Sequence, residues 1–324
     1  MAGNSVSVLF LTSELRSLGR KNYNSGQITR EYADGQPMAG IASITRFTGH
    51  IEPNTALGRF IRNQLTGANA ITTETIQQQL PREYRGRPIE PAYRREVLSI
   101  PFLIDDDVIL KVITRRTAHL HNLLVRAVNY RARRNDCPPF LTGHNSPLKA
   151  AEYRFTILDS LFSNGGTVPQ PIHYDSMDSA AYVITNYRPT EKTFENVYNT
   201  DHAFIEALST INILHQHNYV HADLYSHIFI DSAAKKPLIT DPVGKAKEDA
   251  LAIAKAYDIA SLALKFTPAL GSWSVAGEIV RRYPTNIIVF IPRLLEILLM
   301  ADSTAKEWAA KSLVNSLNET LSGH

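Results

Sequence analysis

Short runs of β-branched and aliphatic residues fill the middle of the chain. REVLSIPFLI and VILKVI, residues 95–104 and 108–113, are separated by three aspartates at 105–107. Two such runs on either side of a tight polar turn predict a β-hairpin. AAYVITNYRP, residues 180–189, has the same character and predicts a further strand.

Apolar residues recur at helical spacing in the segments around and after these strands. SPLKAAEYRFTILDSLFSN opens with Ser146 and Pro147, which are typical of a helix start. DHAFIEALSTINILHQHNYV, residues 201–220, repeats apolar residues every three or four positions and predicts an amphipathic helix. A strand-rich part followed by a helical part predicts an α+β fold in two lobes.

The pattern divides the chain into three parts. Residues 1–90 form an N-terminal extension with a candidate helix in ALGRFIRNQL and no recognisable chemistry. Residues 91–190 form a strand-rich lobe with a basic helical insertion, and residues 191–324 form a helical lobe. The longest apolar stretch starts at Asn286 and is interrupted by Pro292, Arg293 and Glu296, so it is shorter than the roughly 20 residues of a membrane-spanning helix. The N-terminus lacks the pattern of a signal peptide.

Composition and charge narrow the classes of function. The 324 residues are 44% hydrophobic and 20% charged, with a formal net charge of +3, which is too small to predict nucleic-acid binding from charge alone. Cys137 is the only cysteine. An intrachain disulfide and a thiolate metal cluster are therefore excluded, and a reducing, cytoplasmic location is expected.

Four charged residues stand in the predicted elements in an order that suits phosphoryl transfer. Lys111 lies inside a strand, Glu152 in the first half of a helix, Asp223 in VHADLYSHIFID and Asp241 in PLITDPVGK. Phosphoryl transfer needs mainly positioned charges around a nucleotide. Lys111 can reach the phosphates, Glu152 can pair with Lys111, Asp223 can orient an acceptor hydroxyl, and Asp241 can hold a metal ion. The motifs of P-loop hydrolases, zinc proteases and serine hydrolases do not occur.

Residues 97–266 resemble the protein-kinase-like superfamily. VILKV resembles its lysine strand, GGTVPQPIHYD the turn after its glutamate helix, and LITDPVG its metal-binding aspartate motif, with Pro242 in place of the usual phenylalanine. Asp258 in KAYDIASLALKF resembles the aspartate that anchors the catalytic loop. The resemblance implies a two-lobed kinase fold that uses ATP and Mg²⁺, with Mn²⁺ as an alternative metal.

Within this superfamily, HADLYSHIFID is most similar to the lipopolysaccharide core heptose kinases. Tyr225 follows the catalytic aspartate by two residues, and His227 stands where other members have a metal-binding asparagine. The resemblance implies His227 as a second metal ligand and a sugar hydroxyl of lipopolysaccharide, or of a related anionic glycan, as the acceptor. The chain departs from the pattern in two places: the stretch from Asp223 to His227 is one residue shorter, and PAYRREVLSIPFLIDD has no glycine. His221 is predicted to hold the loop in place.

The basic segment TRRTAHLHNLLVRAVNYRARRND, residues 114–136, lies between the lysine strand and the glutamate helix. Its arginines fit either a solvated helix face or a surface for an anionic partner, such as a glycolipid at the inner membrane. Three alternatives stay open: a protein Ser/Thr/Tyr kinase, a catalytically weak pseudokinase that acts as a binding module, and a nucleic-acid-binding protein. Nucleic acid is the least favoured partner, because this segment is the single argument for it.

Overall fold

The computed structural model of the chain describes residues 72–92, 99–188, 190–191, 200–231, 233–234, 236–299 and 304–322. All of these residues belong to one compact unit, Arg46–His324. The helix predicted in ALGRFIRNQL lies outside the described residues.

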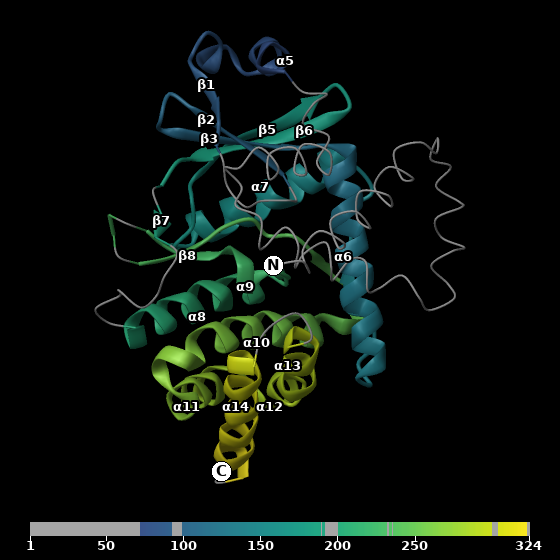
Figure 1. Cartoon of the computed structure of the whole chain (residues 1–324), viewed down its shortest axis with the longest axis vertical. Coiled ribbons are helices and arrows are strands. Elements are labelled where there is room, and N and C mark those ends of the chain that lie inside the picture. Colours follow the sequence, from purple (N-terminus) through teal and green to yellow (C-terminus); the bar gives the residue numbers. More distant parts are fainter. Residues whose placement is uncertain are drawn as a thin grey trace, which may run out of the picture. The chain divides into compact units, whose positions relative to one another are not determined.

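A five-stranded antiparallel sheet forms the strand-rich part, in the order β1-β2-β3-β6-β5 (Figure 1). Its strands are β1 Ile89–Pro91, β2 Ile100–Ile104, β3 Val108–Ile113, β5 Pro171–Met177 and β6 Ala180–Asn186. The predicted hairpin is confirmed as β2 and β3, with Ile104 opposite Val108. Asp105 and Asp106 in its turn have φ values of 55° and 60°, a left-handed conformation that aspartate tolerates better than most residues. Residues 95–98 of the predicted strand lie outside the described part.

Helices cover both faces of the sheet. On one face, α5 Thr73–Gln79 and the short helix η2 Arg82–Tyr84 bury Ile76, Leu80 and Tyr84 against side chains of β2, β3 and β6. On the other face lies α7 Pro147–Ser163, which starts as predicted, because the Ser146 side chain accepts a hydrogen bond from the Lys149 amide. The sheet also extends across the boundary predicted between residues 90 and 91, since β1 spans it.

A 20-residue helix, α6 Arg115–Arg134, connects β3 to the short strand β4 Leu141–Thr142. Thr114 caps its start in a reciprocal pair of hydrogen bonds with Thr117, the geometry of a capping box. The insertion predicted from the basic segment is therefore one continuous helix. In Figure 1, α6 runs beside both the sheet and the helical part.

The helical part is built around α10 Leu251–Leu270, which is buried along most of its length. The helices around it are α8 Thr200–Gln216, α9 Leu224–His227, α11 Ser272–Arg282, α12 Thr285–Ile288, α13 Ile291–Leu299 and α14 Thr304–Ser322. A second sheet joins β7 Thr190–Glu191, β8 Ile228–Asp231 and β9 Pro237–Ile239, and β10 Lys245–Ala246 pairs with β4. The remaining element is the short helix η4 Glu248–Ala250.

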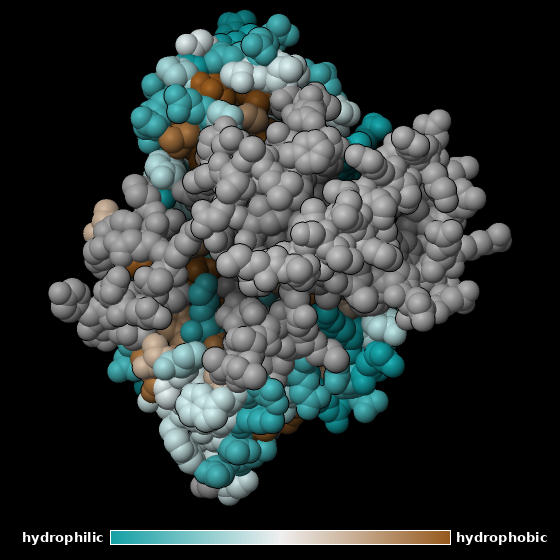
Figure 2. All heavy atoms as spheres, viewed as in Figure 1, coloured by the Kyte–Doolittle hydropathy of each residue, from teal (hydrophilic) through white to brown (hydrophobic). Residues whose placement is uncertain are grey.

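The fold is α+β, with a strand-rich part that leads into a helical part, as the sequence predicts. The lysine strand β3 lies in the middle of an antiparallel sheet, α7 packs on that sheet, and β6 leads into the helical part. On the face seen in Figure 2, hydrophilic side chains cover most of the described surface, with apolar side chains in small patches. Within the described ranges, every helix is too short or too polar to span a bilayer.

Candidate active site

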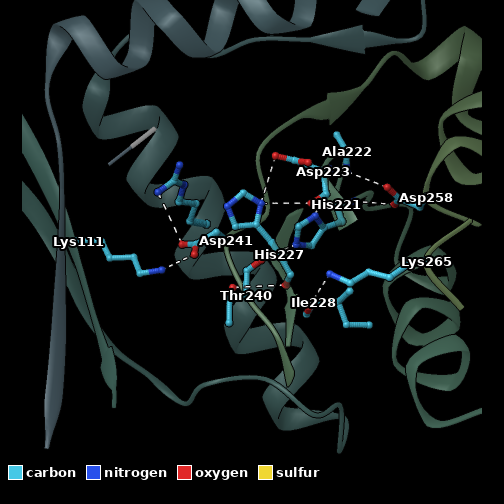
Figure 3. A network of polar contacts seen from close by, with 11 residues as sticks. Lys111, His221, Ala222, Asp223, His227, Ile228, Thr240, Asp241, Asp258 and Lys265 are labelled. Atoms are coloured by element: carbon cyan, nitrogen blue, oxygen red, sulfur yellow. Dashed lines mark hydrogen bonds and ion pairs between the residues drawn. The ribbon is translucent and has the colours of Figure 1, made fainter. Parts of the chain in front are cut away.

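One buried carboxylate holds the loop of residues 220–227, which we call the Asp223 loop. Asp258 of α10 is completely buried. It accepts hydrogen bonds from the backbone amides of His221 and Ala222, each at 2.7 Å. Ala222 has a φ of 67°, which is a strained backbone conformation for a residue with a Cβ. The two charge-assisted hydrogen bonds to Asp258 hold the backbone in this conformation. Asp258 thus has the anchoring role that the resemblance implied (Figure 3).

His221 ties the Asp223 loop to residues 240–244, which we call the Asp241 loop. Its Nδ1 accepts a hydrogen bond from the Asp223 amide at 3.2 Å. Its Nε2 must therefore carry the hydrogen, which it donates to the Thr240 carbonyl at 2.6 Å. Burial lowers the pKa of His221, so the ring is neutral at pH 7. Both ring nitrogens therefore form hydrogen bonds that hold the loop in place, as predicted.

The two loops also meet through their backbones. The Val243 amide donates to the His221 carbonyl at 2.8 Å. A Cβ on Gly244 would lie 2.7 Å from the Cβ of Ala222, so this approach requires glycine. The hydroxyl of Tyr153 on α7 lies 3.0 Å and 2.6 Å from the carbonyl oxygens of Val220 and Gly244. α7 therefore contacts both loops at once.

Asp223 and His227 face each other across one turn of α9. Nδ1 of His227 lies 3.2 Å from the Asp223 carbonyl oxygen and 3.2 Å from its carboxylate. Since both oxygens are acceptors, Nδ1 carries the hydrogen. The Asp223 side chain remains 30% exposed, so its carboxylate is accessible to solvent. Figure 3 shows His227 between Asp223 and Asp241.

Lys111 and Asp241 form a buried ion pair, although they lie 130 positions apart in the sequence. Lys111 comes from the middle of β3, and Asp241 from the turn after β9, where its φ is 55°. Burial alone would raise the pKa of Asp241, but Lys111, His227 and Arg154 together hold it below its usual range. Asp241 is therefore ionised at pH 7.

The α7 residue beside this ion pair is Arg154 instead of Glu152. Nη1 of Arg154 lies 3.9 Å from the second carboxylate oxygen of Asp241, and its side chain is 6% exposed. Glu152 differs from the prediction: its side chain is 40% exposed, and its carboxylate pairs with Lys149 at 2.7 Å. Residues two apart on a helix do not share a face. The register of α7 thus turns Arg154 inward and Glu152 outward.

Two buried histidines lie close enough to Arg154 for its charge to affect them, and no motif in the sequence marks either one. His121 comes from α6, His144 follows β4, and their ring centroids are 5.4 Å apart. Burial, with a contribution from Arg154, lowers the pKa of His121 to about 3 and that of His144 to about 4. Both are neutral at pH 7. The sequence gives only a weak indication that His121 is buried: it lies on the apolar side of a helix whose opposite side carries arginines.

Metal ligands are sparse in this arrangement. Within the described ranges, no three His, Cys, Asp or Glu side chains are grouped as a metal site. Asp241 offers hard carboxylate oxygens, which suit Mg²⁺, and this cation needs only one or two carboxylates when it is bound together with nucleotide phosphates. Asp241 therefore suits a metal ion that is bound jointly by the protein and by the phosphates of a nucleotide.

No protein-family model and no curated protein matches the sequence. Among solved structures, the chain is similar to the GDP complex of wild-type aminoglycoside 2'-phosphotransferase-IIIa. The identity is 11%, the match covers 76% of this chain and 98% of that chain, and the TM-score is 0.40.

Proposed function

We propose that the protein is an ATP-dependent phosphotransferase that acts on an alcohol group. The observation that carries this proposal is the convergence of Lys111, Asp223 and Asp241 from three separate segments of the chain (Figure 3). A buried lysine, a buried carboxylate and a solvent-accessible carboxylate supply the charges that phosphoryl transfer uses. Buried ion pairs contribute little net stability compared with apolar packing, which supports a functional reason for placing these charges here.

In the proposed mechanism, Lys111 exchanges Asp241 for phosphate oxygens of the nucleotide. Asp241, left without that partner, would hold Mg²⁺, or Mn²⁺ in its place. When bound, the metal supplies charge neutralisation at the phosphates. The low pKa of Asp241 keeps its carboxylate ionised and ready for this role. The role of His227 as a second metal ligand stays a prediction, since its Nδ1 faces Asp223.

Asp223 is the residue that we propose to act on the acceptor hydroxyl. Its carboxylate orients the acceptor hydroxyl and takes its proton as the hydroxyl oxygen bonds to the γ-phosphorus. The bond from that phosphorus to the oxygen of the leaving ADP breaks in the same transfer. The contact with His227 and the anchoring of the loop by Asp258 support a fixed position for this carboxylate.

For the acceptor, we propose a sugar hydroxyl of lipopolysaccharide or a related anionic glycan. The support is one face of α6, on which successive residues are 100° apart. Its exposed residues form a stripe at 0–100° around the helix axis, opposite the buried side of His121, Val125 and Ala132. We call it the α6 basic face, and its members are Arg115, Arg116, His119, Arg126, Tyr130, Arg133 and Arg134.

This face fits a glycolipid headgroup at the inner surface of a membrane. Helix α6 contains no acidic residue, and it extends about 28 Å at 1.5 Å per residue. Several cationic side chains along one line attract a negatively charged surface, and aromatic side chains such as Tyr130 suit the interfacial region. We therefore propose peripheral contact with an anionic membrane.

A second candidate is a catalytically weak binding module. Lys111 contacts Asp241 directly, an arrangement in which each group neutralises the other before any nucleotide is present. The sequence also lacks glycine from residue 87 to 142, so a glycine-rich phosphate loop does not precede Lys111. These two features favour nucleotide binding without turnover as the alternative. A protein hydroxyl remains the alternative acceptor.

The test is ATP turnover with Mg²⁺ or Mn²⁺ against a panel of glycans, glycolipids and proteins, with nucleotide affinity measured in parallel. Asp223→Ala is expected to lower transfer by about 10²- to 10⁴-fold, the usual contribution of a general base. Its nucleotide affinity should stay close to that of the wild type, since the carboxylate addresses the acceptor.

Asp159→Asn provides the control, because Asp159 is exposed on the far half of α7 and should leave both quantities unchanged. Wild-type turnover by Asp223→Ala would exclude the proposed role. Nucleotide binding without transfer to any acceptor would select the binding module.

A further inference from the structure

The hydroxyl of Tyr153 lies between the two loops that carry the carboxylates of the site. It is 3.0 Å from the carbonyl oxygen of Val220 and 2.6 Å from that of Gly244. A phenolic hydroxyl has one hydrogen to donate, and both carbonyl oxygens are acceptors, so the two loops share a single donor. This donor holds both carbonyl oxygens against one point of α7.

The two carbonyls stand close in sequence to the two carboxylates. Val220 precedes Asp223 by three residues, and Gly244 follows Asp241 by three residues. A change at the Tyr153 hydroxyl would therefore alter the spacing of the two loops. With it would change the distance between the carboxylates of Asp223 and Asp241.

The ring of Tyr153 is held by two neighbouring rings. Its centroid lies 4.8 Å from that of His144 and 6.3 Å from that of Tyr219, which meets it edge-on. An aromatic side chain has only two rotatable χ angles, so packing around the ring fixes the hydroxyl as well. Burial raises the pKa of Tyr153, and the hydroxyl therefore keeps its hydrogen and remains a donor at pH 7.

The spacing of the loops bears on the rate of transfer more than on binding. In the proposed function, the nucleotide and its metal bind on the side of Asp241, and the acceptor hydroxyl binds on the side of Asp223. Each ligand can then occupy its own side while the reacting atoms stand too far apart. Reacting atoms must come within about 3–3.5 Å, and a misplacement of about 1 Å can lower a rate by about 10²-fold.

We propose that Tyr153 is a positioning residue for phosphoryl transfer, which sets the spacing of the Asp223 loop and the Asp241 loop through its hydroxyl. The inference rests on the proposed function, because the reaction that Tyr153 serves is the transfer proposed above. It adds a role for α7 that differs from the one predicted for Glu152. Helix α7 aligns the two loops through a neutral hydroxyl.

The experiment compares the kinetics of the wild type, Tyr153→Phe and Tyr153→p-aminophenylalanine at a temperature at which circular dichroism shows all three to be folded. Tyr153→Phe keeps the ring and removes the donor. We expect its kcat to fall by about 10- to 100-fold. The Kd of ATP and the KM of the acceptor should stay within about twofold of the wild type, because the contacts of each ligand are retained. An aryl amine also donates hydrogen, so Tyr153→p-aminophenylalanine should recover most of the lost kcat.

Tyr182→Phe is the matched control. Tyr182 is also buried, but it packs on the face of the sheet opposite to α7, so the loss of its hydroxyl should leave kcat unchanged. The inference is overturned if Tyr153→Phe has the kcat of the wild type. It is also overturned if Tyr153→p-aminophenylalanine is as slow as Tyr153→Phe, since the donor then does not set the rate.

If Tyr153→Phe does not fold, amide hydrogen exchange of the wild type gives the decision. Binding of ATP with Mg²⁺ should slow exchange in residues 240–244 and, through the shared hydroxyl, in residues 220–227 as well. Slower exchange in residues 240–244 alone would show that the two loops are independent and would reject the inference.

The outcome for the proposed function is read separately. If the wild type transfers phosphate to no acceptor, both the proposed function and the inference fail. If the wild type transfers phosphate and Tyr153→Phe does so with the same kcat, only the inference fails, and Tyr153 has a role in packing alone.

Discussion

At the scale of single residues, the Asp223 loop depends on the two carboxylate oxygens of Asp258. They accept from the amides of His221 and Ala222, and Lys265 on the same helix donates to the Ile228 carbonyl at 3.0 Å. These contacts fix the backbone on both sides of Asp223. The position of Asp223 is therefore set by Asp258 and Lys265, two residues of α10.

Replacing Asp258 by alanine should destabilise the protein, because two buried backbone amides lose their acceptor. At about 1–3 kcal/mol for each unsatisfied group, the free energy of unfolding should fall by about 2–6 kcal/mol in urea denaturation. Asp159→Asn, which changes an exposed carboxylate, should remain within about 0.5 kcal/mol of the wild type. Equal stability of Asp258→Ala and the wild type would show that the loop is held by other contacts.

At the scale of elements, α6 is attached to the site by two asparagines. Asn122 donates to the His144 carbonyl at 2.9 Å, and the Asn129 side chain bonds to the backbone of Phe140 and Leu141. A Cβ on Gly143 would lie 1.7 Å from Oδ1 of Asn122, so the first contact requires glycine. These bonds hold one side of α6 against the chain and leave the α6 basic face exposed.

The α6 basic face should bind anionic membranes. We expect a fourfold variant to lose about 10²- to 10³-fold in affinity for phosphatidylserine or phosphatidylglycerol vesicles, at about 1 kcal/mol per arginine. The substitutions are Arg115→Gln, Arg126→Gln, Arg133→Gln and Arg134→Gln. In the transfer assay the apparent KM for a glycolipid acceptor should rise, with kcat at saturation little changed, because uniform binding is lost.

A control variant removes the same charge from positions elsewhere on the chain. Its substitutions are Lys149→Gln, Lys236→Gln, Arg281→Gln and Lys311→Gln, all at exposed side chains. It should bind vesicles like the wild type. If both variants bind equally at low salt, the arginines of α6 form a solvated face and the membrane proposal is rejected. Binding to RNA with a steep salt dependence would instead indicate a nucleic-acid partner.

At the scale of the whole molecule, buried neutral histidines link stability to pH. His121, His144, His215 and His221 are all buried, and burial lowers the pKa of each one. In the unfolded chain these rings titrate near pH 6.5. Below that pH the unfolded state binds protons that the folded state does not, so stability falls as the pH falls.

We expect the free energy of unfolding to decrease between pH 7 and pH 5, by about 2 kcal/mol for each of His121 and His144 at pH 5. Their contribution to this decrease should continue until the pH approaches their folded pKa values of about 3 and 4. Denaturant unfolding at several pH values measures the slope. His144→Gln should have a shallower slope, whereas His217→Gln, at an exposed position, should keep that of the wild type. A slope unaffected by His144→Gln contradicts the prediction.

The sequence by itself determined the order and type of the elements. Ser146 and Pro147 define the start of α7, three aspartates define the turn between β2 and β3, and the basic segment forms one helix. These features are local: capping, turn geometry and apolar periodicity act within a few residues, so a linear pattern contains them. The anchoring of the loop by Asp258 also followed from the sequence, through the resemblance of its motif.

Only the tertiary structure decided which side chains meet. The sequence places Glu152 and Arg154 on one helix, but the rotation of α7 against the sheet turns Arg154 toward Asp241 and Glu152 toward Lys149. Likewise, nothing near residue 121 indicates that α6 brings a histidine to within 5.4 Å of His144. Contacts between distant segments depend on how whole elements pack, and a shift of two residues on a helix reverses the face that a side chain occupies. The charges of the site were therefore predictable from the sequence, but their pairing was not.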